Sequence, residues 1–274
     1  MTLTTIIAAK QEELHIERSV ASAQELGPVV VVAGGSADRT SALATAAGAP
    51  VLEHAWEGYA AQKNWAIDNL PIETDWVLFM DADERLTPEL RTEIAGALER
   101  SEHDGFYVAR ANIFLGRPLK HVWWYPDYQL RLFRQGRARY EDRSVHEHVV
   151  VHGSTGFLTE PLVHENLKGI DAFLERHVRY AALEASEILR GRSLDDASLR
   201  GSFRGTWPER RRALKTRIWY RLPGRPAIRF FWMYFVRRGF LDGRQGLIYA
   251  QLIAAYEAMI DAKLFELEER RRAS

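Results

Sequence analysis

Two aspartates, Asp81 and Asp83, follow directly after an uninterrupted apolar run at residues 76–80. Such a run predicts a strand that is buried on both faces of a parallel sheet. Residues two apart in an extended chain point the same way, so the two carboxylates can converge on one point. Hard oxygen donors suit Mg²⁺ or Mn²⁺, which takes waters and substrate phosphates as its other ligands. The alternative to a metal–phosphate site is a solvated turn after a core strand.

The segments around the aspartates alternate between strand-like and helix-like patterns. This alternation predicts right-handed crossovers and a parallel sheet. Open sheets of this kind bind ligands beyond the carboxyl ends of their strands, which is where Asp81 and Asp83 lie. The helix that begins near Tyr59 places Lys63 and Asn64 about one turn in. We expect strands at residues 3–9, 28–32, 50–53 and 76–80, and helices at 14–26, 41–48, from 59 to about 70 and from 88 to about 100.

A second set of strands begins at Gly105 and is alternating and aromatic-rich. It predicts an antiparallel addition to the sheet, so the architecture is mixed α/β. Between these strands, residues 121–128 hold two Trp and two Tyr. Two functions are open for the three aromatic residues Trp123, Trp124 and Tyr125. They either fill the hydrophobic space under a loop, or they stack against a sugar ring, because the C–H faces of sugars pack on aromatic faces. The strands of this set are expected at 105–111, 128–133, 148–152 and 161–164.

Length and composition describe a globular protein of one large domain with an extension. The chain has 274 residues, 37 Lys or Arg, 37 Asp or Glu and no Cys. Without Cys there is no disulfide, thiolate metal site or cysteine nucleophile. The first residues read as a strand and no stretch is long and apolar enough for a membrane span. We therefore expect a cytoplasmic protein.

The chain after residue 165 has helical patterns only, so we expect a sheet domain at 1–165 and a helical extension at 166–274. Residues 200–245 hold 13 Lys or Arg against 2 Asp or Glu, interleaved with aromatic side chains such as Trp207, Trp219 and Trp232. This block fits an anionic membrane surface, nucleic acid, or a solvated helical face packed on the sheet domain. We expect peripheral attachment to the inner face of the cytoplasmic membrane, and no nucleic acid as partner.

In an ordered series of motifs the chain resembles family 2 glycosyltransferases of the GT-A fold. The similarity is greatest to the bacterial branch that includes the lipopolysaccharide-core β-1,4-glucosyltransferases. It implies a Rossmann-like, mostly parallel sheet flanked by helices. The motifs that carry it lie at residues 9–13, 35–40, 56–64, 75–84, 124–134, 145–147 and 161–164.

The resemblance also implies roles for single residues. Asp127 would be the general base. Asp81 would face the donor near ribose and metal, and Asp83 would bind Mn²⁺ or Mg²⁺. His164 would be the third metal ligand, with His146 as the competing candidate. The donor nucleotide and diphosphate would be bound by Glu12, Asp38, Lys63, Asn64 and Arg131, and the acceptor by Trp123, Trp124 and Tyr125.

Two residues depart from the branch pattern. Ala33, followed by Gly34, stands where the branch usually has an Asp that touches the base or ribose, so the nucleotide stays open. Gln11 stands where Asn is usual.

The expected reaction is transfer of a hexose from a nucleotide-diphosphate sugar, such as UDP-glucose, to a lipid-linked or lipopolysaccharide-core glycan. One base and in-line attack would invert the anomeric configuration. A sugar-1-phosphate nucleotidylyltransferase is an alternative, although residues 10–13 lack the glycine its loop would need. A non-catalytic, membrane-associated protein of the same fold is another.

Each site residue also has a structural interpretation. Asp127 could cap a strand, and Arg131 could pair with an acid such as Glu141. His146 and His164 could be ordinary histidines of the core or surface. Lys63 and Asn64 could belong to a solvated helix face.

Overall fold

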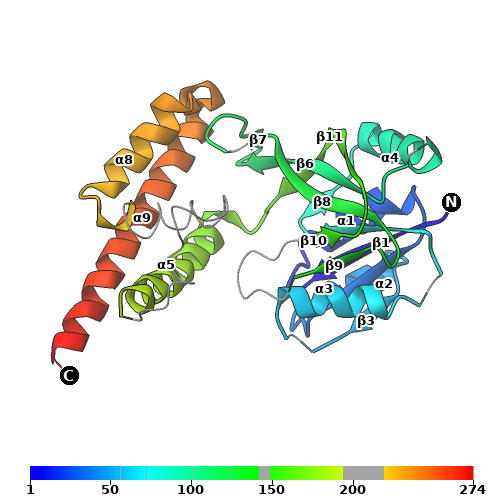
Figure 1. Cartoon of the computed structure of the whole chain (residues 1–274), viewed down its shortest axis with the longest axis horizontal. Helices are drawn as coiled ribbons and strands as arrows, with labels where there is room; N and C mark the ends of the chain where they lie inside the picture. The colour runs from blue at the N-terminus through cyan, green and yellow to red at the C-terminus, as the bar shows by residue number, and fades with distance from the viewer. Residues whose placement is uncertain are drawn as a thin grey trace. The chain divides into compact units, whose positions relative to one another are not determined.

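A computed structural model describes residues 1–55, 57–71, 73–100, 102–123, 125–141, 149–193 and 219–273. The chain divides into two compact units (Figure 1). The first unit comprises Met1–Lys120 and Trp124–Leu167, and the second comprises His121–Trp123 and Lys168–Ser274.

The first unit is a mixed sheet flanked by helices, as expected from the sequence. Its strand order is β3-β2-β1-β4-β8-β6-β11-β5, with β7 paired to β6. Strands β3, β2, β1 and β4 are parallel, and β8 runs antiparallel to both of its neighbours, β4 and β6. The strands of this sheet are β1 (Leu3–Ala9), β2 (Val29–Ala33), β3 (Val51–Glu53), β4 (Trp76–Asp81), β5 (Glu84–Arg85), β6 (Gly105–Phe114), β7 (Arg117–Pro118), β8 (Asp127–Arg134) and β11 (Thr155–Glu165).

Helices cover both faces of the sheet because the central strands are apolar on both sides. Ile7 and Met80 pack into a core shared with α1, α2 and α4, whereas Ile6 and Phe79, each one residue earlier, pack into a second core that includes α3. The alternation of side chains along a strand accounts for this division. The helices are α1 (Ile16–Gln24), α2 (Thr40–Ala46), α3 (Tyr59–Asp68) and α4 (Pro88–Arg100).

The later strands differ from the sequence-based expectation in three ways. The strand expected at 161–164 is the second half of β11, which begins at Thr155. The strand expected at 148–152 is β10 (Val149–Val151), and it pairs with β9 (Ala138–Tyr140) in a separate two-stranded sheet. Strands β5, β7 and β9 were not expected, because segments of two or three residues carry too little periodicity to identify.

Arg131 owes its position to a β-bulge in β8. Phe106 and Tyr107 are consecutive in β6, yet they pair with Leu132 and Leu130 of β8, so Arg131 is the extra residue between them. A bulge of this kind bends the strand and re-aims a side chain, and bulges are frequent next to active sites.

The second unit is helical. In Figure 1, α8 lies alongside α9, and contacts also join α5 to α9. Its core contains Ala181, Ala185 and Ile188 of α5 and Ile260 and Leu264 of α9. None of the described helices is long and apolar enough to cross a membrane. The elements are α5 (Gly169–Ser193), η1 (Trp219–Arg221), α8 (Arg225–Phe231), the π-helix η2 (Trp232–Val236), η3 (Gly239–Asp242) and α9 (Gly243–Ala273).

Candidate active site

Two loops at the carboxyl ends of β1 and β2 are joined through Asp38. Its carboxylate accepts hydrogen bonds from the backbone N–H groups of Thr40 (3.1 Å) and Glu13 (3.3 Å). The Thr40 hydroxyl in turn accepts the Glu12 N–H at 2.8 Å. Burial raises the pKa of Asp38, but the hydrogen bonds from Thr40 and Glu13 outweigh it and lower the pKa. Asp38 therefore stays ionised and braces the loop that carries Glu12.

Glu12 is held by His15, a residue that the sequence pattern did not single out. The two side chains are 2.6 Å apart, from His15 Nδ1 to Glu12 Oε2. His15 Nε2 lies 2.8 Å from the Leu167 N–H and accepts its hydrogen bond, so Nδ1 carries the proton and donates to Glu12. His15 is fully buried, and it links the first loop to the segment that follows β11.

Asp81 lies at the end of β4, and its side chain, which is 35% exposed, is close to three buried charged residues. Arg131 Nη2 donates both to Asp81 Oδ2 at 2.7 Å and to Glu84 Oε1 at 2.6 Å. Lys63 Nζ is 3.5 Å from Asp81 Oδ1 and faces the rings of Phe79 and Tyr140. The Asp81 backbone N–H donates to the second oxygen of Glu84 at 2.9 Å.

The charges of this cluster decide its ionisation. Burial alone would raise the pKa of Asp81, but the charges of Arg131 and Lys63 hold it far below the usual range for an aspartate. Burial would lower the pKa of Arg131, yet Asp81 and Glu84 raise it well above its ordinary value. Burial raises the pKa of Glu84. Asp81 is thus a fixed negative charge between two cations. The sequence suggested Glu141 as a structural partner of Arg131, and the structure shows Asp81 and Glu84 instead.

Lys63 and Asn64 are adjacent in sequence but have different surroundings. Lys63 is 8% exposed and points at Asp81. The Asn64 side chain bonds to the backbone of Tyr140 at both ends, with 2.9 Å from Nδ2 to the carbonyl and 2.9 Å from Oδ1 to the N–H. Asn64 therefore attaches α3 to β9.

Asp83 and His164 face each other across the sheet edge. Their closest atoms, Oδ2 and Nε2, are 3.1 Å apart. Burial raises the pKa of Asp83 and lowers that of His164, but the hydrogen bond between them reverses both effects, so the pKa falls for Asp83 and rises for His164. The register of β11 places His164 opposite Glu84.

This carboxylate and imidazole fit a divalent cation that takes its remaining ligands from water and phosphate. Among the described residues there is no group of three or more His, Cys, Asp or Glu side chains that could hold a metal by itself. His146, the competing candidate ligand, lies outside the described residues.

Asp127 begins β8 and pairs with Arg110 of β6. Arg110 donates to Asp127 Oδ2 from Nε (3.2 Å) and Nη2 (2.8 Å), and Gln129 donates to Oδ1 at 3.0 Å. Because β8 runs antiparallel to β4, the first residue of β8, Asp127, lies at the same edge of the sheet as Asp81 at the carboxyl end of β4.

Asn112 is a second residue that sequence reasoning missed. It lies in β6, opposite His164 and two residues after Arg110, so the three side chains share one face of the sheet. The Asn112 side chain is buried, with 5% exposure, and neither of its amide atoms has a hydrogen-bond partner. Most buried polar groups are paired, so the Asn112 amide is an exception that lies beside candidate site residues.

The aromatic residues that were expected to meet an acceptor fall into different units. Trp123 belongs to the second unit and packs on Tyr249, with ring centroids 5.3 Å apart. Tyr125 belongs to the first unit, where Lys120 Nζ lies 5.9 Å from the centre of its ring. Trp124 lies outside the described residues.

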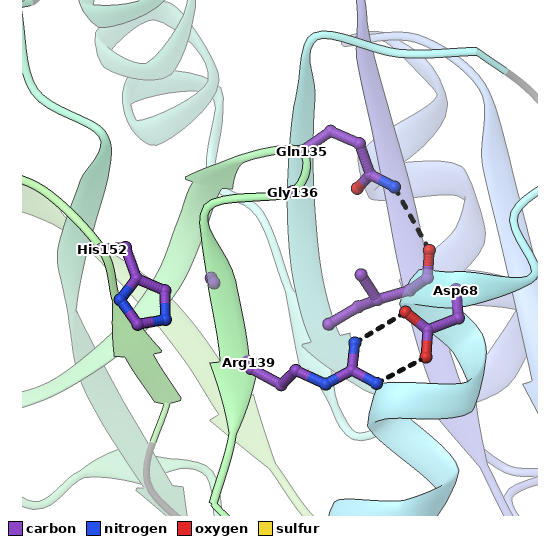
Figure 2. A pocket seen from close by; sticks show the side chains of 7 residues that line it. Asp68, Gln135, Gly136, Arg139 and His152 are labelled. Atoms are coloured by element: carbon purple, nitrogen blue, oxygen red, sulfur yellow. Dashed lines mark hydrogen bonds and ion pairs between the residues drawn. The ribbon is translucent and has the colours of Figure 1, made fainter.

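A surface hollow in the first unit lies away from this site (Figure 2). It is lined in part by Gln135 and Gly136, which follow the carboxyl end of β8, whereas Asp127 begins that strand. Figure 2 shows Arg139 in a two-pronged ion pair with Asp68, at 2.7 and 2.8 Å. Asp81, Asp83, Asp127 and His164 do not line this hollow.

Comparison with known proteins identifies the family. The family described as Glycosyl transferase family 2 matches residues 4–162, more than half of the chain. The lipopolysaccharide core biosynthesis glycosyltransferase LpsC of Rhizobium meliloti is 28% identical over 97% of this chain and 93% of its own length. An uncharacterised glycosyltransferase of Rickettsia bellii is 25% identical over 97% of this chain and 86% of its own length.

Among solved structures, Staphylococcus aureus TarS in complex with UDP-GlcNAc is 14% identical, with a TM-score of 0.47 over 93% of this chain and 90% of that one. Glucosyl-3-phosphoglycerate synthase of Mycobacterium tuberculosis, in complex with Mn²⁺, UDP and glucosyl-3-phosphoglycerate, is 22% identical. Its TM-score is 0.36 over 41% of this chain and 44% of that one. On the strength of the family match, the chain belongs to glycosyl transferase family 2.

Proposed function

We propose that the chain is an inverting, metal-dependent hexosyltransferase. Its donor would be a nucleotide-diphosphate sugar of the UDP-glucose type, and its acceptor a lipid-linked or lipopolysaccharide-core glycan. The observation that carries the proposal is the gathering of Asp81, Asp83 with His164, and Asp127 with Arg110 at one edge of the sheet. The acceptor class is supported by the similarity to LpsC over nearly the whole of both chains.

Asp127 is suited to accept a proton from an acceptor hydroxyl. Its side chain is 21% exposed, so a substrate can approach it, and Arg110 and Gln129 fix its orientation. A positioned carboxylate acting as general base contributes typically about 10²- to 10⁴-fold to a rate. In-line attack by the deprotonated hydroxyl inverts the anomeric centre, so no second carboxylate is needed as a nucleophile.

The leaving diphosphate needs positive charge. Asp83 and His164 would hold a Mn²⁺ or Mg²⁺ ion, which supplies Lewis-acid stabilisation of that diphosphate. Arg131 and Lys63 are committed to Asp81, so their role in the site is to keep the Asp81 carboxylate ionised and oriented. The uncommitted amide of Asn112 would bond a polar group of the substrate.

The proposal is tested by Asp127→Asn, with Asp68→Asn as a matched control. Asp68 is also an aspartate paired with an arginine, but it lies at the surface beside the hollow of Figure 2. We expect the Asp127 variant to lose on the order of 10²-fold or more in transfer, with donor affinity nearly unchanged, and Asp68→Asn to transfer normally. Normal turnover by Asp127→Asn would show that another group is the base.

The donor is identified by titrating UDP-, GDP- and dTDP-sugars in the presence of Mn²⁺. The position where an aspartate would contact the base or ribose is Ala33, which is buried at the end of β2. We expect a UDP-sugar to raise the melting temperature most. A larger rise with a GDP- or dTDP-sugar would show that the donor carries that nucleotide instead of UDP.

A further inference from the structure

The second unit exposes eight large apolar side chains between residues 222 and 241, seven of them on α8, η2 and η3, and we name these eight side chains the apolar face. In soluble proteins, large exposed apolar patches usually mark interaction surfaces. Of the 20 exposed large hydrophobic residues in the described chain, eight fall between residues 222 and 241. They are Leu222 38%, Ile228 41%, Phe231 58%, Trp232 46%, Phe235 50%, Val236 51%, Phe240 47% and Leu241 50% exposed.

Other residues of the same segment are buried within the second unit. These buried contacts leave the residues of the apolar face exposed to solvent. Arg225 is fully buried and forms ion pairs with Glu257 and Asp261 of α9. Met233 is 4% exposed. A Cβ at Gly239 would lie 2.3 Å from a Val122 side-chain atom and 2.6 Å from the Met233 carbonyl, so the turn after η2 packs closely against its surroundings.

The exposed rings are also ordered by one another. Phe231 and Phe235 have ring centroids 5.2 Å apart, and Tyr234 and Phe235 5.1 Å. Phe230 stacks on Tyr234 at 5.5 Å. Because the rings already contact one another, less side-chain entropy is lost when a partner covers them than for isolated rings.

The segment that carries the apolar face is rich in arginine, and its one acid, Asp242, is buried. Residues 221–241 contain five Arg and no Asp or Glu. The charge of Arg225 is matched inside the unit by the acids of α9, but Arg238 and Arg244 are exposed and Arg229 is half-buried. The segment thus combines exposed apolar side chains with exposed arginines.

We propose that the apolar face inserts into the interface of an anionic phospholipid bilayer. Amphipathic segments with Trp, Phe and Leu on one side and Arg or Lys beside it lie in the plane of such an interface. Each Lys or Arg near an anionic surface adds about 1 kcal/mol to binding, which is about fivefold in affinity.

Two other occupants fit less well. A nucleic acid would use the rings for stacking, but it would leave aliphatic Ile228, Val236 and Leu241 uncovered. A second copy of this chain in a two-fold interface would bring the like charges of Arg238 and Arg244 toward their equivalents. The sequence also predicts peripheral membrane attachment. The present proposal adds which residues would make that attachment.

The test is sedimentation with vesicles of phosphatidylcholine, with and without about one third phosphatidylglycerol, in the absence of any donor sugar. We expect the full chain to bind anionic vesicles, and to bind less as salt is raised. The double variant Phe231→Ser, Trp232→Ser should lower that affinity by on the order of 10-fold or more. Arg238→Gln with Arg244→Gln should lower it by about 10- to 30-fold on anionic vesicles and leave weak binding to neutral vesicles unchanged.

Phe265→Ser is the matched control, because Phe265 of α9 is 65% exposed and outside the apolar face. It should bind vesicles as the unaltered chain does. The inference is overturned if the unaltered chain stays in solution, if Phe265→Ser reduces binding equally, or if the face variants change only self-association in sedimentation velocity. Nucleotide binding measured without vesicles tests the proposed glycosyl transfer separately, so the two ideas can fail independently.

Discussion

Replacing Asn112 by Leu should stabilise the protein while it damages transfer. Leucine has nearly the same size and removes an amide that has no partner for either polar atom at 5% exposure. An unsatisfied buried polar group costs about 1–3 kcal/mol of stability. For a chain of this size, each kcal/mol corresponds to a shift of roughly 2–4 °C in melting temperature. The expected rise is therefore roughly 2–12 °C.

Transfer should change in the opposite direction. If Asn112 bonds the substrate, its loss leaves a substrate polar group unpaired in a buried site, which is worth about 1–3 kcal/mol, or on the order of 10- to 100-fold in kcat/KM. The measurements are thermal unfolding without ligand and initial transfer rates with a UDP-sugar.

Asn64→Leu is the contrasting control, since that amide bonds at both ends to Tyr140. It should lower the free energy of unfolding by about 1–3 kcal/mol and have a smaller effect on kcat/KM. If Asn112→Leu melts at or below the temperature of the unaltered chain, or retains full transfer, the assignment of Asn112 to the substrate is wrong.

Three further predictions concern the charged groups. Arg131→Met should lower the free energy of unfolding by about 3–5 kcal/mol, because it leaves the fully buried Glu84 carboxylate without its arginine and removes one of the two cations beside the partly exposed Asp81. Urea denaturation measures it, and an unchanged midpoint would contradict the geometry. His164→Ala should weaken Mn²⁺ binding in calorimetry by on the order of 10-fold or more, and unchanged affinity would place the ion elsewhere. Arg139→Gln should leave the urea midpoint nearly unchanged, since its pair with Asp68 is about half exposed and screened by solvent, and a clear drop in the midpoint would contradict this reasoning.

The local pattern was enough to predict the parallel half of the sheet. Residues 76–80 are buried in β4, and the aspartates follow at its carboxyl end, because an apolar run bounded by acids is compatible with few structures other than a buried strand. The expected helices also occur within a few residues of their predicted limits up to residue 100.

The partners of the site residues depend on contacts between distant parts of the chain, which periodicity does not encode. Asp127 reaches the edge beside Asp81 because β8 inserts between β4 and β6, and Arg131 points at Asp81 and Glu84 from a bulge that no sequence signal announces. His15 likewise meets Leu167 across more than 150 residues.

The sequence alone therefore determined which strands are buried and which acids end them, since burial on a strand follows a period of two that can be read from neighbouring residues. Only the tertiary structure decided which cation forms an ion pair with which carboxylate, and which buried amide has no hydrogen-bond partner. Those outcomes depend on strand order and register, and register is selected by the packing of the whole sheet rather than by any one segment.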